Sequence, residues 1–190
     1  MPVPRAIKTH IITSYYGLPK VRKGGLVVEI TDGDAYFYRG HFFYDLVKTT
    51  VIRMAFALSQ ELKDRGITAL AVTPGFLRSE WMLDNFGVTE ANWRDAAEKM
   101  KSFIASETPL FVGRGIAALA ADPNVAKKNG RVVASWDLGV EYGVTDADGT
   151  RPHFVRWLQD NEPEVAAGWR KLDDPFYAYW GPVPYQAPGG

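Results

Sequence analysis

The segment GITALAVTPG, residues 66–75, decides the fold class, because it joins the end of a helix to a buried strand and then to a turn. Gly66 is typical of a helix terminus, and residues 68–73 form an apolar, β-branched run that predicts a buried strand. The preceding helix, predicted over residues 42–65, has apolar residues on more than one face, as a helix buried on several sides does. Pro74-Gly75 ends the strand.

Further helices and strands flank this segment. A helix is predicted over residues 5–21 and a strand over residues 26–31. After the central strand, the sequence has helical patterns over residues 80–86 and 90–104. A further helix begins with Thr108 as N-cap and Pro109, and a strand is predicted over residues 131–136. This alternation predicts an α/β protein, a three-layer parallel sheet with right-handed crossovers.

Composition excludes several classes of function. The 190 residues include 22 Lys and Arg against 22 Asp and Glu, so the net charge is zero and predicts no binding to nucleic acid or anionic membranes. The chain has no cysteine, which rules out disulfides, thiolate metal sites and thiol nucleophiles. The three histidines are scattered, so no metal site is expected. No apolar run is long enough to span a membrane, and we expect a cytoplasmic protein.

Tyr44 and Lys48 are the first candidates for chemistry. Four residues apart on a helix, they share a face, and an ammonium beside a phenol lowers the phenol pKa. Such a tyrosine can exchange a proton with a carbonyl or alcohol oxygen. This spacing is also common between a half-buried tyrosine and a solvated lysine. The pair opens the helix between two predicted parallel strands, and ligands bind beyond the carboxyl ends of such strands.

Several stretches, in this order, resemble the short-chain dehydrogenase/reductase family. They are residues 24–30, 44–48, 72–79, 117–123 and 130–143. The resemblance covers about residues 5–150 and implies the C-terminal half of a Rossmann-like dinucleotide-binding fold. It also implies an NAD(P)-dependent oxidoreductase, with NAD or NADP as cofactor and a small carbonyl or alcohol as substrate.

The resemblance assigns a role to each matching residue. Tyr44 would be the general acid, and Lys48 would lower its pKa and hold the nicotinamide ribose hydroxyls. Pro74, Gly75 and Phe76 would bind the cofactor, with the Pro74-Gly75 backbone shaped against the nicotinamide. Ser79 stands where the family usually has a threonine that binds the carboxamide, so a hydroxyl is kept.

Asp32 departs from the family pattern. It aligns with a catalytic serine that donates a hydrogen bond to the reacting oxygen, whereas an ionised carboxylate only accepts. Asp32 could donate if burial kept it protonated. Thr31 could replace the serine instead, but that shift of one residue would turn its side chain to the other face of the sheet.

The phosphate-binding half of the family fold has no counterpart in this sequence. The nearest glycine pattern, Gly113-Arg114-Gly115, falls inside a predicted helix and is better explained by close helix packing. Three hypotheses follow. The chain is an oxidoreductase whose other half is lost or comes from a partner; it is a catalytically silent remnant that binds a ligand; or it is a self-associating module.

The sequence divides into residues 1–150, the family-like domain, and residues 151–190, a C-terminal extension. Residues 153–160 could form a short amphipathic helix. Residues 176–185 are rich in aromatic residues and proline and form an arm that is either disordered or packed on another surface. A homo-oligomer is expected through helices 5–21 and 43–65. Aromatic residues at 36–38 and 42–43 would line a pocket or join the core.

Overall fold

The computed structural model describes residues 3–171. Its strands are β1 (Leu26–Ile30), β2 (Ala35–Tyr36), β3 (Thr68–Thr73), β4 (Val132–Ala134) and β5 (Arg170–Lys171). Its α-helices are α1 (Val3–Gly17), α2 (Phe42–Glu61), α3 (Glu80–Phe86), α4 (Pro109–Ala121), α5 (Ser135–Tyr142), α6 (Phe154–Asn161) and α7 (Pro163–Ala167). Short 3₁₀ helices are η1 (Leu18–Lys20), η2 (Lys63–Arg65), η3 (Trp93–Glu98), η4 (Lys101–Ala105) and η5 (Val125–Lys128).

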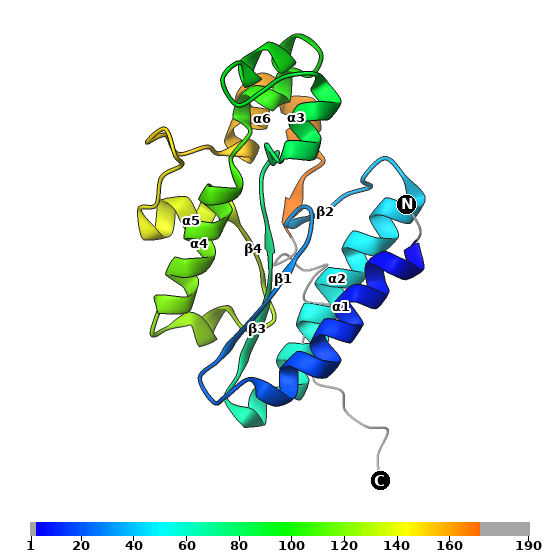
Figure 1. Ribbon diagram of the computed structural model, residues 1–190, viewed down its shortest axis with the longest axis vertical. Helices are drawn as coiled ribbons and strands as arrows, with labels where there is room; N and C mark the ends of the chain where they lie inside the picture. Colours follow the sequence, from blue (N-terminus) through cyan, green and yellow to red (C-terminus); the bar gives the residue numbers. More distant parts are fainter. Residues whose placement is uncertain (1–2, 172–190) are drawn as a thin grey trace.

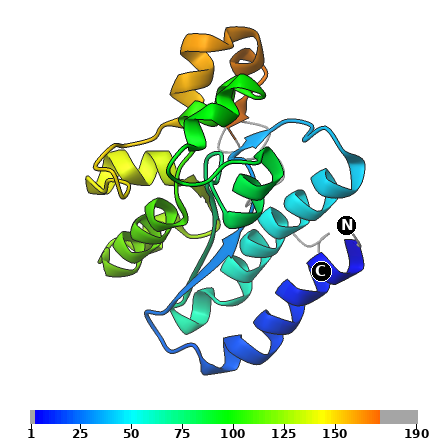
Figure 2. The same cartoon turned by 45° about the horizontal axis from the view of Figure 1, so that its top comes forward.

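Strands β1, β3 and β4 form one parallel sheet in the order β1-β3-β4. Helices α1 and α2 lie on one side of this sheet, and α4 and α5 lie on the other (Figures 1 and 2). The predicted α/β class and three-layer parallel sheet are therefore confirmed. In this order β3 is central, and β1 occupies an edge.

Strand β3 is buried along its whole length because both faces of the sheet are covered. Leu70 and Val72 point to the α4–α5 side, where they pack with Leu119 and Leu138. Ala69 belongs to the cluster on the opposite side, with the end of α2. The chain turns from η2 into β3 through Gly66, whose φ of 63° lies in the left-handed region that glycine adopts without strain.

Three local predictions need correction. The third strand is shorter than expected, since β4 ends at Ala134 and Ser135 already begins α5. Residues 90–104 form the two 3₁₀ helices η3 and η4 instead of one longer helix. Thr108 does precede α4 as its N-cap residue, but its hydroxyl makes no capping bond and binds the carboxylate of Asp146. For Thr108, the tertiary contact with Asp146 outweighs the local capping preference.

Residues 76–106 form a lobe beyond the C-terminal ends of the strands, at the top of Figure 1. The lobe has its own apolar cluster of Phe86, Trp93, Ala96 and Phe103, against which Phe76 packs. Arg78, whose side chain is almost fully buried, donates to Glu90 and to the carbonyl of Ser106. Its guanidinium also lies 4.0 Å from the centre of the Trp93 ring. These contacts tie the lobe to the segment that follows β3.

The described part of the C-terminal extension packs on the lobe and the loop after β1. Helix α6 confirms the predicted short helix and contacts η4. Strand β5 pairs antiparallel with β2, and the Trp169 indole donates to Asp34 across 2.9 Å. The aromatic and proline-rich arm at 176–185 lies outside the described residues. Within residues 3–171, no helix combines the length and apolarity that a membrane crossing requires.

Candidate functional site

The candidate site lies at the edge where β1 and β3 end. The amide of Thr31 donates to the carbonyl of Val72, and the amide of Gly33 donates to the Thr73 hydroxyl across 2.7 Å. These bonds bring the loop after β1, which carries Asp32, beside the segment after β3, which begins with Pro74. The structure thus joins the two predicted parts of the site.

Tyr44 contacts Asp32 directly. The phenol hydroxyl donates to Asp32 Oδ2 across 2.8 Å, from the first turn of α2. The side chain remains 36% exposed, so the hydroxyl is not sealed into the core. Burial of part of the ring raises the pKa of Tyr44 above its usual value, and the Asp32 carboxylate raises it further. The phenol therefore holds its proton at neutral pH.

Lys48 lies on the same face of α2, one turn later. Its Nζ is 5.5 Å from the centre of the Tyr44 ring. Burial lowers the pKa of this lysine, and Asp32 opposes that shift. The predicted effect of Lys48 on the phenol pKa stays a prediction. Burial and the Asp32 carboxylate raise the pKa of Tyr44, and the charge that opposes this rise is the Arg39 guanidinium.

Asp32 and Thr31 differ in their contacts. Thr31 is buried, and its hydroxyl donates to the carbonyl of Lys48 across 2.9 Å. That hydroxyl is thus engaged with the main chain of α2. Asp32 is the residue that meets the phenol, as the unshifted alignment predicts.

Arg39 is a site residue that the sequence analysis missed. Its Nε donates to the Asp32 carbonyl across 2.6 Å, and its Nη1 lies 2.9 Å from Asp45 Oδ1. The guanidinium therefore holds the Asp32 loop against the start of α2. An arginine in a short aromatic-rich loop carries no sequence signal for this role. Phe42 and Phe43, expected in a pocket or in the core, are largely exposed.

The predicted cofactor-binding residues after β3 lie in different surroundings. The carbonyl of Pro74 accepts from the Thr73 hydroxyl across 2.9 Å. The Phe76 ring packs edge-on against Phe103, 5.0 Å between ring centres, inside the lobe. The Ser79 hydroxyl accepts from the amide of Met82 and caps α3. Pro74 and Gly75 therefore remain at the sheet edge, whereas the side chain of Phe76 serves the lobe core.

Gly75 is held by two further residues that the sequence analysis did not single out. Its amide lies 3.0 Å from Glu107 Oε2 and 3.2 Å from the Ser135 hydroxyl. A Cβ on Gly75 would lie 2.9 Å from Glu107 Oε2 and 3.3 Å from Phe154 Cβ. A larger residue here would therefore push the Glu107 carboxylate out of its present position.

The described residues fit one end of a nicotinamide cofactor better than the other. The Pro74-Gly75 turn and the Lys48 ammonium could hold a nicotinamide and its ribose. Gly113 and Gly115 lie inside α4, and a Cβ on Gly115 would be 3.3 Å from the Leu138 side chain. The expected packing role of Gly115 is confirmed, and this glycine pair forms no phosphate-binding turn.

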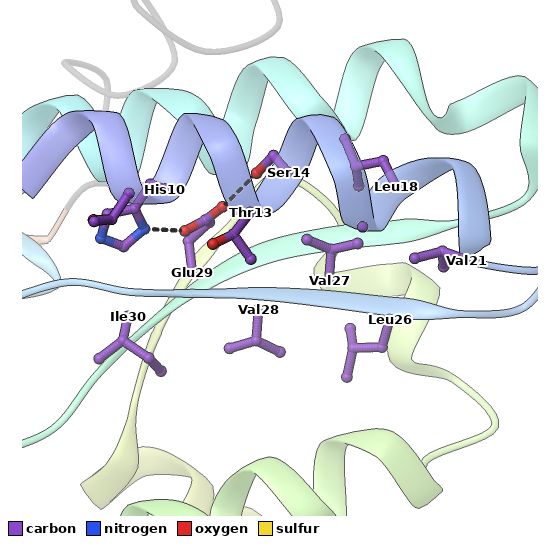
Figure 3. Close-up of a pocket in the computed structure, with 12 residues that line it drawn as sticks. His10, Thr13, Ser14, Leu18, Val21, Leu26, Val27, Val28, Glu29 and Ile30 are labelled. Atoms are coloured by element: carbon purple, nitrogen blue, oxygen red, sulfur yellow. Dashed lines mark hydrogen bonds and ion pairs between the residues drawn. The ribbon is translucent and has the colours of Figure 1, made fainter.

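A groove of about 450 Å³ runs along the edge strand β1 and beneath α1 (Figure 3). Val27 and Glu29 point from β1 toward α1, and Leu26, Val28 and Ile30 point to the other face. His10 Nδ1 is 2.5 Å from Glu29 Oε2, and the Ser14 hydroxyl donates to the other oxygen of that carboxylate. None of the predicted site residues lines this groove.

Comparisons with known proteins extend over most of the chain. Dehydrogenase/reductase SDR family member 1 from mouse is 31% identical over 147 residues, which cover 75% of this chain and 47% of that protein. The human protein of the same name is 29% identical over 146 residues, with the same coverage. The chain belongs to the short-chain dehydrogenase/reductase family. It spans about half the length of these curated relatives, and no family model matches it.

Solved structures of short-chain dehydrogenases share the fold. A short chain dehydrogenase from Mycobacterium thermoresistibile superposes with a TM-score of 0.57 at 18% identity, over 76% of this chain and 50% of that one. The angucycline C-6 ketoreductase LanV, solved with bound NADP, gives a TM-score of 0.54 at 20% identity, over 68% and 49%. The three strands thus correspond to part of the Rossmann-like sheet of these short-chain dehydrogenases.

Proposed function

We propose that this chain forms the catalytic half of an NAD(P)-dependent oxidoreductase that acts on a small carbonyl/alcohol pair. The observation that carries the proposal is the hydrogen bond between Tyr44 Oη and Asp32 Oδ2, with the Lys48 ammonium beside the same ring. This group stands at the carboxyl ends of two parallel strands, where α/β proteins bind ligands. The names of the relatives support the same reaction class.

Tyr44 is the proton donor in this proposal. Its raised pKa keeps the phenol protonated at neutral pH, so it can donate to the oxygen of a carbonyl substrate. A bound nicotinamide cofactor supplies the hydride for reduction or accepts it in oxidation. The exposed part of the ring allows a substrate to approach the hydroxyl from solvent.

Asp32 can accept the phenol proton of Tyr44. In alcohol oxidation the substrate hydroxyl proton passes to Tyr44 Oη, while the original phenol proton passes to Asp32 Oδ2. Carbonyl reduction moves both protons in the opposite direction and begins after Asp32, which is partly exposed, has taken a proton from solvent. Without such transfer, a phenolate beside an ionised Asp32 would place two negative charges together. Lys48, close to the ring, offsets part of that charge and holds ribose hydroxyls.

The phosphate-binding half would complete the site from the β1 side. Strand β1 is an edge strand, and an unpaired edge offers backbone donors and acceptors to a further strand. The groove beneath α1 adjoins this edge. We infer that the missing half adds to β1, whether it belongs to the same polypeptide or to a separate one.

A nucleotide titration tests this function. We expect NADPH or NADH to bind weakly and saturably at millimolar concentration, and the Lys48→Met variant to lose this binding. Lys63→Met, on the exposed η2, is the matched control and should bind like the unmodified chain. An absence of binding by the folded chain contradicts the proposal for this chain alone. Binding without carbonyl reduction would favour a silent ligand-binding module.

Self-association is a second role, favoured by apolar residues exposed on the outer faces of α1 and α2. They are Ile11, Ile12, Tyr15, Tyr16, Phe42, Phe43 and Leu46. The two helices contact each other, so these residues contribute to neighbouring surfaces. We propose a homo-oligomer through α1 and α2. Light scattering should give a dimer or larger that Tyr15→Lys converts to a monomer, and a monomeric unmodified chain would contradict it.

A further inference from the structure

Glu107 precedes α4 and joins the segment after β3 through its main chain. Its amide donates to the carbonyl of Phe76 across 2.9 Å, and its carbonyl accepts from the amide of Arg78 across 2.7 Å. Leu77 and Glu107 thereby form an isolated parallel bridge. The residue is thus aligned with the chain that leaves the Pro74-Gly75 turn.

The side chain of Glu107 also contacts the Pro74-Gly75 turn. It is 1% exposed, and its Oε2 accepts from the Gly75 amide across 3.0 Å and from the Ser135 hydroxyl across 2.6 Å. Ser135 begins α5 directly after β4. One carboxylate oxygen therefore links the ends of β3 and β4 to the start of α4.

The other oxygen, Oε1, is buried and has no hydrogen-bond partner among the residues that the structure describes. Burial raises the pKa of Glu107 to about 7, against the bonds from Ser135 and Gly75 that favour the ion. The charged groups that face it are Asp146, which also raises this pKa, and Arg78, which lowers it. The charge of this carboxyl therefore changes near neutral pH while its contacts remain enclosed.

We propose that Glu107 is a positioning residue that sets the Pro74-Gly75 turn and makes the hold on the Gly75 amide depend on pH. The inference rests on the proposed function, which gives this turn its place against the nicotinamide. An ionised carboxylate accepts a stronger hydrogen bond than a neutral acid does. Ionisation of Glu107 therefore tightens the turn, and protonation loosens it.

Hydrogen bonds also connect the Pro74-Gly75 turn to the loop that carries Asp32. Pro74, next to Gly75, accepts from Thr73, and Thr73 accepts from the amide of Gly33, which follows Asp32. A continuous set of bonds therefore runs from the buried carboxyl to the loop that meets Tyr44. Through these bonds Glu107 acts on the site without touching the substrate.

Amide NMR of the ¹⁵N-labelled chain tests the proposal without any cofactor. In the unmodified protein the Gly75 amide shift should titrate with a midpoint of about 7. Glu107→Gln keeps an acceptor oxygen but carries no charge, so its Gly75 shift should stay constant over the same range. Glu98→Gln, an exposed carboxyl in the same lobe, is the control and should titrate like the unmodified chain.

Hydrogen exchange gives a second readout of the turn. Glu107→Ala should raise the exchange rate of the Gly75 amide about 10- to 100-fold, as expected for loss of a charge-assisted bond. Glu107→Gln should restore only part of the protection, because its neutral oxygen accepts a weaker hydrogen bond than a carboxylate does. If Glu107→Ala does not fold, the pH titration of the Gly75 amide in the unmodified chain still tests the proposal.

Two outcomes overturn the inference. One is a Gly75 shift that does not change between pH 5 and 9, about two pH units on either side of the expected midpoint, while the chain stays folded. The other is a titration that persists in Glu107→Gln. Failure of the proposed function looks different, because the Gly75 amide would titrate as expected while NADPH and NADH fail to bind.

Discussion

Two regions near the C-terminal ends of the strands differ in exposure and in contacts: the accessible side around Tyr44 and the enclosed side around Glu107. Tyr44 is 36% exposed and makes one side-chain hydrogen bond, to the carboxylate of Asp32. Glu107 is 1% exposed and is bonded through its amide, its carbonyl and one carboxylate oxygen. The groups that would meet substrate are therefore accessible, whereas the residue that sets the backbone near them is enclosed.

The largest effect should come from the accessible side. Tyr44→Phe removes the proposed proton donor, so carbonyl reduction should fall about 100- to 10,000-fold while thermal stability changes little. Steady-state rates of NADPH consumption measure this loss. Tyr142→Phe is the matched control. Tyr142, the last residue of α5, donates to Asp122 after α4, so this substitution should leave turnover unchanged. Equal rates in Tyr44→Phe and the unmodified protein would remove Tyr44 from the mechanism.

On the enclosed side, ionisation of Glu107 should change the free energy of unfolding. The pKa of Glu107 rises from 4.5 to about 7 on folding, so the folded state binds more protons between these values. The contribution of this group to stability is therefore present below about pH 4.5 and is lost as the pH rises to 7, by about 3 kcal/mol in total. Urea unfolding of Glu107→Gln should lack this loss. Parallel curves for both proteins across pH 4.5–7 would contradict the assignment.

Thr73→Val should weaken the connection between the two sides. The substitution keeps the shape of a fully buried side chain but leaves the Gly33 amide without its acceptor. We expect a loss of about 1–3 kcal/mol in the free energy of unfolding. Thr89→Val, at an exposed turn, is the control and should stay within about 0.5 kcal/mol of the unmodified chain. A neutral Thr73→Val would show that the two sides are held independently.

Asp32→Ser should give the smallest change in turnover, and it tests the carboxylate that meets Tyr44 on the accessible side. Serine removes the carboxylate that helps to raise the pKa of Tyr44, so that pKa should fall and be seen in an ultraviolet titration of the tyrosines. In the proposed mechanism Asp32 exchanges a proton with Tyr44, and serine cannot take over that role, so carbonyl reduction should fall by roughly tenfold. Asp148→Asn, in an exposed turn, is the control. An Asp32→Ser enzyme that reduces the carbonyl as fast as the unmodified protein would show that the carboxylate is not needed for proton transfer.

The accessible side was the more predictable one. The spacing of Tyr44 and Lys48, the parallel strands and the turn at Pro74 all follow from patterns within a few residues of the chain. The direction of the Tyr44 pKa shift could not be predicted in the same way. Burial and Asp32 raise that pKa, and neither effect is visible as a local sequence pattern. Arg39 was missed for the same reason, because its partners are set by how the loop folds back on α2.

The enclosed side could not be predicted from the sequence. Glu107 contacts residues 32 positions before it and 28 positions after it, Gly75 and Ser135, and no spacing rule connects them. The same long-range effects shortened β4, since Ser135 begins a helix while binding Glu107. Thr108 matched the N-cap pattern, yet its hydroxyl went to Asp146, 38 residues away. Sequence periodicity describes the elements and not the polar contacts between them.

Glu29 bears on whether copies of the chain aggregate. Among the described residues, β1 has a strand neighbour on one side only, and Glu29, with His10 and Ser14 bound to it, lines the groove along that strand. Charged residues beside an open strand edge discourage edge-to-edge pairing, because an added strand would have to cover them. The Glu29 carboxylate should therefore disfavour aggregation of the chain through β1.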